Sequence, residues 1–173
     1  PYVKDEYGLP VGFESESLQV SGAVVQEVCR SPSHWASKMT LDGWLRRGKV
    51  PGISGIDTRE LTKKLRVHGV MMGVLEVSET PATDKVLLTM LKKSRRYNDI
   101  NFIEEVSVKQ PVEYGAGDDV VVLLDCGVKR SLLDFLEDIC RCQVMVVPAW
   151  TKALDILSLK PTGVFLSNGP GDP

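Results

Sequence analysis

The residues with the clearest chemical potential form the turn Asn168-Gly169-Pro170-Gly171. It directly follows the apolar run Val164-Phe165-Leu166, so we expect a strand that ends in this turn. Glycine lets a backbone approach a ligand closely, and proline stiffens a turn. Open α/β sheets bind ligands at the carboxyl ends of their strands, where the N–H groups of such a turn would lie. Preset N–H groups stabilise developing negative charge, as in an oxyanion hole.

Two other interpretations of this turn stay open from the residues alone. A phosphate loop is one of them, but the turn lacks the Gly-Lys-Ser/Thr ending of a P-loop and the G-x-G-x-x-G spacing. No helix follows it in the chain to supply a dipole. A plain turn is the other interpretation.

Cysteine chemistry is a second candidate. Cys126 lies in Leu124-Asp125-Cys126-Gly127, where a nucleophile at a strand-to-helix elbow would stand. A cysteine nucleophile needs a base, normally histidine, and no histidine follows Cys126. We therefore favour a small packed residue. Cys140 and Cys142 form a C-x-C pair, a weak metal signal, and we expect reduced thiols and no metal site.

The elements that must position the turn form a regular alternation from Val120 onward. Apolar runs and helical spacing predict, in order, a strand at 120–124, a helix at 132–140, a strand at 144–147, a helix at 153–159 and a strand at 164–166. This βαβαβ order predicts a parallel sheet with right-handed crossovers. It is about half of a doubly wound domain, so one edge of the sheet should be covered.

The first part of the chain mixes short strands and helices. Strands are expected at 18–28, 51–56 and 70–77, and helices at 35–47, 57–68 and 86–96. Asp57 with Glu60 forms a capping-box pattern, and Gly69 suits the end of that helix. The basic runs 62–66 and 92–96 are interpreted as solvated helix faces, with a partner-binding face as the alternative.

These patterns predict an α/β protein with a first domain at 1–110, a linker at 111–119 and a second domain at 120–173. The linker contains Pro111 and ends in the breaker cluster Gly115-Ala116-Gly117. The chain begins with Pro1 and ends in the glycine turn, so we expect an internal piece of a longer polypeptide.

Composition excludes several classes of function. Of the 173 residues, 43% are hydrophobic and 25% charged, as in ordinary soluble proteins, and the formal net charge is -2. This balance gives no electrostatic case for nucleic acid or a membrane surface as a partner. No apolar run is long enough for a membrane span. We expect a cytoplasmic protein.

Taken together, three stretches resemble the carbamoyl-phosphate synthase family. Phe165 to Pro173 resembles the signature turn of its class I (triad) glutamine amidotransferase domain, and Asp125 to Lys129 resembles the segment that opens this domain. Gly55 to Arg66 resembles a stretch of the N-terminal small-chain domain. Phe13-Glu14-Ser15 and Pro32-Ser33-His34-Trp35 resemble the eukaryotic pyrimidine-pathway form.

The resemblance implies a small-chain domain followed by the first half of a flavodoxin-like amidotransferase domain. Such domains hydrolyse glutamine through a cysteine thioester and channel ammonia to a synthetase domain or large subunit. The synthetase uses ATP, Mg and bicarbonate, and no cofactor is implied for this chain. By resemblance, the N–H of Gly169 belongs to the oxyanion hole, and Gly169 and Gly171 bind glutamine.

The family's nucleophile lies in a later Gly-x-Cys-x-Gly elbow, and its histidine and glutamate follow that elbow. Because all three are absent here, we expect this chain alone to be inactive. An ammonia-dependent relative, in which the amidotransferase fold serves a structural or regulatory role, is the alternative. A pure interaction domain is the third hypothesis. The intact Ser167-Asn168-Gly169-Pro170-Gly171 turn favours the glutamine user.

Overall fold

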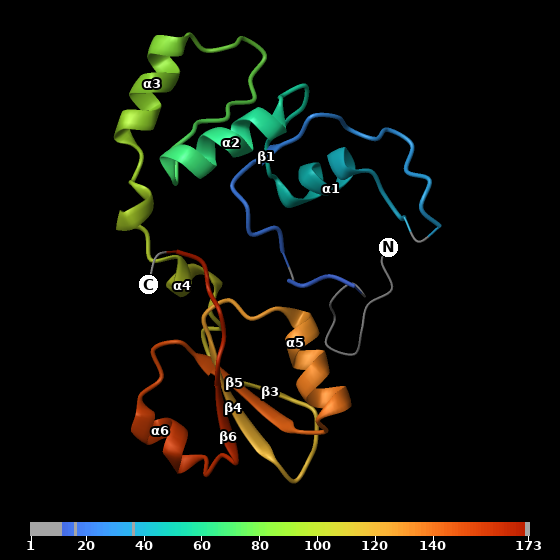
Figure 1. Ribbon diagram of the computed structural model, residues 1–173, viewed down its shortest axis with the longest axis vertical. Helices are drawn as coiled ribbons and strands as arrows, with labels where there is room; N and C mark the ends of the chain where they lie inside the picture. Colours follow the sequence, from blue (N-terminus) through green and yellow to red (C-terminus); the bar gives the residue numbers. More distant parts are fainter. Residues whose placement is uncertain (1–11, 16, 36, 172–173) are drawn as a thin grey trace. The chain divides into compact units, whose positions relative to one another are not determined.

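The computed structural model describes residues 12–15, 17–35 and 37–171, and the chain forms two compact units (Figure 1). The first unit comprises residues 1–11 and 16–97, and the second comprises 12–15 and 98–173. The units divide at Tyr97, earlier than the sequence-based boundary at 110, because Val108 and Tyr114 pack against the core of the second unit. Asp172 and Pro173, which end the predicted turn, lie outside the described residues.

The first unit is a mixture of short helices and a small parallel sheet. Its helices are α1 (Leu41–Gly48), α2 (Thr58–His68) and α3 (Asp84–Lys93), and its strands are β1 (Ala23–Val24) and β2 (Gly52–Ile53). The predicted cap of α2 is confirmed: Asp57 Oδ1 accepts a hydrogen bond from the Glu60 N–H at 2.9 Å. Gly69 ends the helix at a positive φ of 76°, which glycine adopts without strain.

Several predicted elements of the first unit differ from the structure. The strands expected at 18–28 and 51–56 shrink to β1 and β2, and residues 70–77 form no strand. The helix expected from residue 35 begins only at Leu41, because the Thr40 side chain accepts a hydrogen bond from the Gly43 N–H at 3.1 Å. A capping threonine fixes the start of a helix in this way.

The second unit is built on a four-stranded sheet in the order β3-β5-β4-β6. Its strands are β3 (Val112–Tyr114), β4 (Val120–Asp125), β5 (Gln143–Pro148) and β6 (Gly163–Leu166). β4 pairs in parallel with both β5 and β6, which confirms the predicted parallel sheet. β3 pairs antiparallel with β5 at one edge, so the segment expected to be a linker contributes a strand.

Short helices precede or connect these strands. They are α4 (Phe102–Val106), α5 (Arg130–Asp134) and α6 (Ala153–Ser158), and a 3-10 turn, η1 (Tyr97–Asp99), precedes α4. The helix predicted at 132–140 appears as α5 followed by one π-helical turn, η2 (Phe135–Ile139). In that turn the Cys140 N–H donates to the Phe135 carbonyl oxygen at 3.1 Å.

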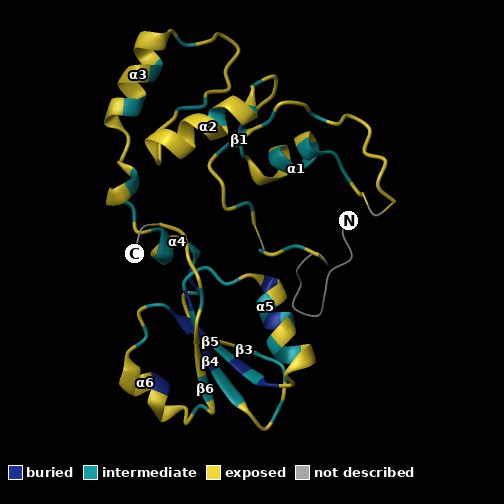
Figure 2. Ribbon diagram, in the orientation of Figure 1, coloured by how far each residue is buried: buried dark blue, intermediate teal, exposed yellow. Residues whose placement is uncertain are grey.

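The core of the second unit lies on both faces of its central strands, as expected for a sheet enclosed by crossover helices. On one face, Leu123, Val144 and Val146 pack with Leu133 of α5. On the other face, Val122 and Val147 pack with Ile156 of α6. Figure 2 shows the buried residues concentrated on β4 and β5. At the opposite edge, β6 leaves Val164 and Leu166 more than half exposed, at 52% and 69%.

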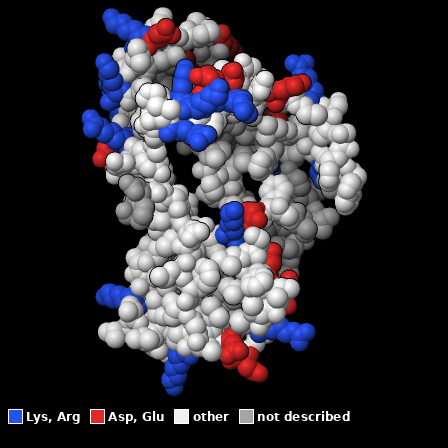
Figure 3. All heavy atoms as spheres, viewed as in Figure 1, with Lys and Arg blue, Asp and Glu red and all other residues white. Residues whose placement is uncertain are grey.

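The two units carry opposite net charges. The first contains 15 Lys and Arg against 10 Asp and Glu, which gives +5, and the second contains 6 against 13, which gives -7. Basic side chains gather over the part that holds α2 and α3 (Figure 3). The net charge of -2 for the whole chain conceals this separation.

Replacing Leu123 by alanine should strongly destabilise the second unit. Its side chain is fully buried, and removing it leaves a cavity, so the free energy of unfolding should fall by about 2–5 kcal/mol. Urea denaturation followed by circular dichroism measures this loss. Leu154→Ala is the matched control: Leu154 is 79% exposed on α6, so its loss should be below about 0.5 kcal/mol. Equal losses would contradict the assignment of the core.

Candidate functional site

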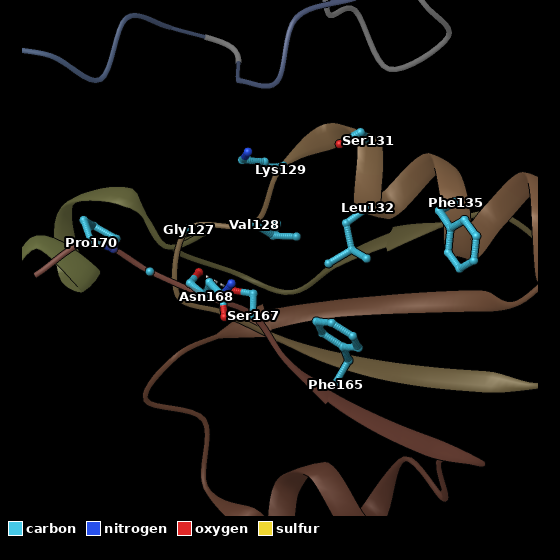
Figure 4. A pocket seen from close by; sticks show the side chains of 11 residues that line it. Gly127, Val128, Lys129, Ser131, Leu132, Phe135, Phe165, Ser167, Asn168 and Pro170 are labelled. Atoms are coloured by element: carbon cyan, nitrogen blue, oxygen red, sulfur yellow. Dashed lines mark hydrogen bonds between the residues drawn. The ribbon is translucent and has the colours of Figure 1, made fainter.

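The predicted ligand turn lies at an open pocket of about 540 Å³ in the second unit. β4 ends at Asp125, β5 at Pro148 and β6 at Leu166, and the lining residues lie around the carboxyl ends of β4 and β6. The pocket is lined by Gly127, Val128, Lys129, Ser131, Leu132, Phe135, Phe165, Ser167, Asn168, Gly169 and Pro170. Leu132, Phe135 and Phe165 lie at one end of it, and Ser167, Asn168 and Pro170 at the other (Figure 4).

Gly169 is the residue of the turn with the least room for a side chain. A Cβ there would lie 2.3 Å from the Cys126 carbonyl oxygen and 2.5 Å from Ile103 Cδ1. Gly169 has no positive φ, so close packing rather than backbone conformation demands glycine. Among the described residues, none accepts a hydrogen bond from the Gly169 N–H. Its predicted role as an oxyanion donor stays a prediction.

Gly171 requires glycine for a different reason. Its φ is 99°, a conformation that L side chains rarely adopt. A Cβ there would meet only Phe102 Cδ2, at an ordinary 3.7 Å. Gly171 is not among the residues that line the pocket. Its predicted role in binding glutamine stays a prediction.

Cys126 supports the turn rather than facing the pocket. Its N–H donates to Ser167 Oγ at 2.8 Å, and it is not among the lining residues. Both histidines of the chain, His34 and His68, belong to the first unit. Within the described part of the second unit, no imidazole base accompanies Cys126. These observations favour the packed residue expected from the sequence.

Asp125 was missed as a site residue by sequence reasoning. It is 3% exposed, and its carboxylate accepts three backbone hydrogen bonds. Oδ1 accepts from the N–H groups of Gly127 and Val128, both at 2.9 Å, and Oδ2 accepts from the Val108 N–H at 2.8 Å. An aspartate that turns back to its own backbone before a glycine is an Asx turn. The Asp125-Cys126-Gly127 pattern carried that signal.

The segment around α4 was also missed, because the sequence placed it before a linker. Ile103 lies against Gly169, and the Ser107 hydroxyl oxygen accepts a hydrogen bond from the Ala149 N–H just after β5. The signal for α4 was Asn101 with Glu104 three residues later. In the structure Asn101 Oδ1 accepts from the Glu104 N–H at 3.2 Å, as a helix cap does.

A short segment from near the start of the chain caps α5 beside the pocket. Glu14 Oε2 accepts a hydrogen bond from the Ser131 N–H at 2.9 Å, and the Glu14 carbonyl oxygen accepts from the Arg130 N–H at 3.2 Å. The hydrogen bonds from Ser131 lower the pKa of Glu14, and the nearby charge of Lys129 lowers it further. The ionised carboxylate therefore stabilises the start of α5.

Metal and thiol chemistry find no support in the described residues. These residues contain no cluster of His, Cys, Asp and Glu that could hold a metal ion. Of the C-x-C pair, Cys142 is buried and Cys140 is exposed. Burial raises the pKa of the Cys142 thiol. In the part of the chain that the structure describes, no helix has the length and apolar character of a membrane span.

Comparison with known proteins identifies the family. A family model described as carbamoyl-phosphate synthase small chain, CPSase domain, matches residues 5–75. The carbamoyl phosphate synthase small chain of Methanopyrus kandleri is 40% identical over 175 residues, covering 99% of this chain and 48% of the relative. The chain belongs to the carbamoyl-phosphate synthase small-chain family. The small chain of Pyrococcus furiosus is 42% identical over 97% of this chain and 45% of its own length.

The similarity extends to bacteria. The small chain of Listeria monocytogenes is 44% identical over 161 residues, covering 93% of this chain and 43% of the relative. This chain thus spans about half the length of the curated relatives that it matches. The matches run through both units, so they include the glycine turn as well as the small-chain domain.

The stability that Glu14 confers should depend on pH. Its pKa is lower in the folded protein than the ordinary 4.5, so its contribution is present above that value and is lost as the pH falls through the folded pKa. Glu14→Gln should therefore lower the free energy of unfolding at neutral pH, with a difference that shrinks on acidification below about pH 4.5. Urea denaturation at several pH values tests this. Asp138→Asn, at an exposed position of η2, is the control, and a pH-independent Glu14→Gln effect would contradict the capping role.

Proposed function

We propose that this chain is part of the glutaminase component of a carbamoyl-phosphate synthase. In this proposal, the complete protein hydrolyses glutamine and delivers ammonia to a synthetase subunit or domain. That partner uses ATP, Mg and bicarbonate to make carbamoyl phosphate for pyrimidine synthesis. The family of the chain and the position of its pocket at the carboxyl ends of parallel strands support the proposal.

The arrangement of strands also supports an amidotransferase domain. β5, β4 and β6 lie side by side in parallel, so the first strand of the alternation lies between the second and the third. The flavodoxin-like order begins in the same way, and its ligands bind where the strand order reverses. In this proposal, the exposed edge of β6 receives the remainder of the sheet.

The observation that carries the proposal is that Gly169 lines the pocket and that its N–H has no acceptor among the described residues. Attack on the glutamine amide creates a tetrahedral intermediate whose oxygen becomes negatively charged. A backbone N–H that is fixed before the reaction stabilises this oxyanion without further reorganisation. Close packing against Cys126 and Ile103 fixes the Gly169 backbone in this way.

The other pocket residues suit a substrate of the size and polarity of glutamine. Ser167 and Asn168 offer hydrogen-bonding groups, and Lys129 brings a positive charge, whereas Leu132 and Phe165 provide apolar contacts. In this proposal the nucleophilic cysteine, its histidine and its glutamate come from parts of the complete protein outside this chain. The chain alone is then inactive as a glutaminase.

The proposal assigns the first unit to contact with the synthetase. Its net charge of +5 and the exposed basic residues of α2 and α3 suit an acidic partner surface. A non-catalytic role in an ammonia-dependent synthase is the second candidate. A protein with this role would keep the fold but would not use the Gly169 N–H in catalysis.

Gly169→Ala in the complete protein with its synthetase separates these functions. The added Cβ would meet the Cys126 carbonyl oxygen at 2.3 Å and so displace the N–H. Loss of one oxyanion donor should lower the kcat of glutamine-dependent synthesis by about 100- to 1,000-fold. Ammonia-dependent synthesis should stay near the wild-type rate, because ammonia bypasses this site. Carbamoyl phosphate formation from each nitrogen source is the measurement.

Gly163→Ala is the matched control for this experiment. Gly163 begins β6, its φ is not positive, and a Cβ there would meet nothing within 4 Å. It should leave both reactions unchanged. Full glutamine-dependent activity in Gly169→Ala would contradict the oxyanion role. A wild-type protein that uses ammonia but not glutamine would favour the second candidate.

A further inference from the structure

We propose that Asp125 is a positioning residue for the pocket, because its buried carboxylate fixes the backbone on which the Gly169 turn rests. The consequence for catalysis rests on the proposed glutaminase function. The structural part of the inference, that Asp125 holds the turn in place, does not depend on it.

The first step is that one carboxylate fastens two separate segments. Through Oδ1, Asp125 holds the N–H groups of Gly127 and Val128, and through Oδ2 it holds the N–H of Val108, 17 residues earlier. All three partners are backbone groups, so Asp125 fixes main-chain positions rather than side chains. A buried carboxylate has a strong demand for such donors, since its charge is otherwise unsolvated.

The second step leads from the loop after β4 to the turn. The Cys126 N–H donates to Ser167 Oγ, and the Cys126 carbonyl oxygen lies only 2.3 Å from the position that a Cβ of Gly169 would take. At Gly127, a Cβ would lie 3.2 Å from Pro170 Cδ. The loop and the turn are therefore packed without spare room, and a shift of the loop moves the turn.

The third step leads from Val108 to the same turn by a second route. Val108 follows α4, whose Ile103 Cδ1 lies 2.5 Å from the position that a Cβ of Gly169 would take, the same position that the Cys126 carbonyl oxygen approaches. Ser107 fastens the same segment to the end of β5 through the Ala149 N–H at 3.1 Å. Gly169 thus packs against two segments that are both fastened to Asp125.

Asp125→Asn changes this arrangement with almost no change in shape. An asparagine has one acceptor oxygen, and its NH₂ group can only donate. In either orientation, at least one backbone N–H then faces another donor inside the protein. Displacements of about 1 Å at a reacting centre can cost 100-fold in rate. We therefore expect kcat for glutamine hydrolysis to fall by about 10- to 100-fold, with little change in KM.

The experiment uses the complete protein with its synthetase and compares wild type, Asp125→Asn and Asp118→Asn. Asp118 is an exposed residue just before β4, so it matches the charge change at the opposite end of the same strand. One readout is kcat and KM for glutamine hydrolysis, with ammonia-dependent synthesis as the check of folding. The other is amide hydrogen exchange in segments 107–108, 126–128 and 167–171.

Faster exchange in these segments and a lower kcat in Asp125→Asn alone support the inference. Unchanged exchange overturns it, as does an equal response to Asp118→Asn. If wild type does not hydrolyse glutamine, the proposed function fails, and the exchange data still decide whether Asp125 positions the turn.

Ser167→Ala keeps the inference testable if Asp125→Asn does not fold. It removes the acceptor of the Cys126 N–H, one connection between the loop and the turn, and also the hydroxyl that donates to the Asn168 carbonyl oxygen, so the exchange at Cys126 is the deciding readout. We expect faster exchange at Cys126 and in the turn, together with a smaller loss of kcat. Unchanged exchange in Ser167→Ala would overturn the coupling between the two segments.

Discussion

The buried carboxylate of Asp125 is the constraint on which the rest of the site depends. Removing a carboxylate from water costs several kcal/mol, and charge-assisted hydrogen bonds offset that cost at roughly 1.5–3 kcal/mol each. Here three backbone N–H groups from two segments share this task. The loop after β4 and the segment after α4 are consequently held together, and the glycine turn packs against both of them. The hydrogen bonds that the Asp125 carboxylate needs at the end of β4 thus help to fix the position of the turn that follows the neighbouring strand β6.

Side chains stabilise the sheet, whereas the turn that follows it presents backbone groups. Fully buried apolar residues on both faces of β4 and β5 make the strands rigid. Beyond Leu166, two positions of the turn require glycine, which has no side chain. At 169 close packing leaves no room for a Cβ, and at 171 a φ of 99° favours glycine. Backbone N–H groups on a rigid support have a fixed direction, which is the property that electrostatic catalysis uses. This division supports the proposed oxyanion role of Gly169.

Much of the second unit could be predicted from the sequence, because its signals are local and strong. Continuous apolar runs correctly predicted β4 and β5. In the first unit, the capping residue Asp57 correctly predicted the start of α2. The site was harder, because its contacts join residues far apart in the chain. The hydrogen bonds between Val108 and Asp125 and between Ser107 and Ala149 are examples, and such long-range bonds leave no periodic pattern in the sequence. The strand predicted at 70–77 was wrong. Apolar content indicates burial, but a strand also needs a neighbouring strand to pair with, and the sequence pattern does not show whether one is present.

The most direct test of the account is a crystal structure of the complete protein with the glutamyl thioester trapped on its nucleophile. The measurement is the distance from the Gly169 nitrogen to the oxygen of the reacting carbonyl. A site built around this turn predicts a hydrogen-bond distance of about 2.7–3.1 Å. A Gly169 N–H that points away from this oxygen, with another group in its place, would contradict the central claim.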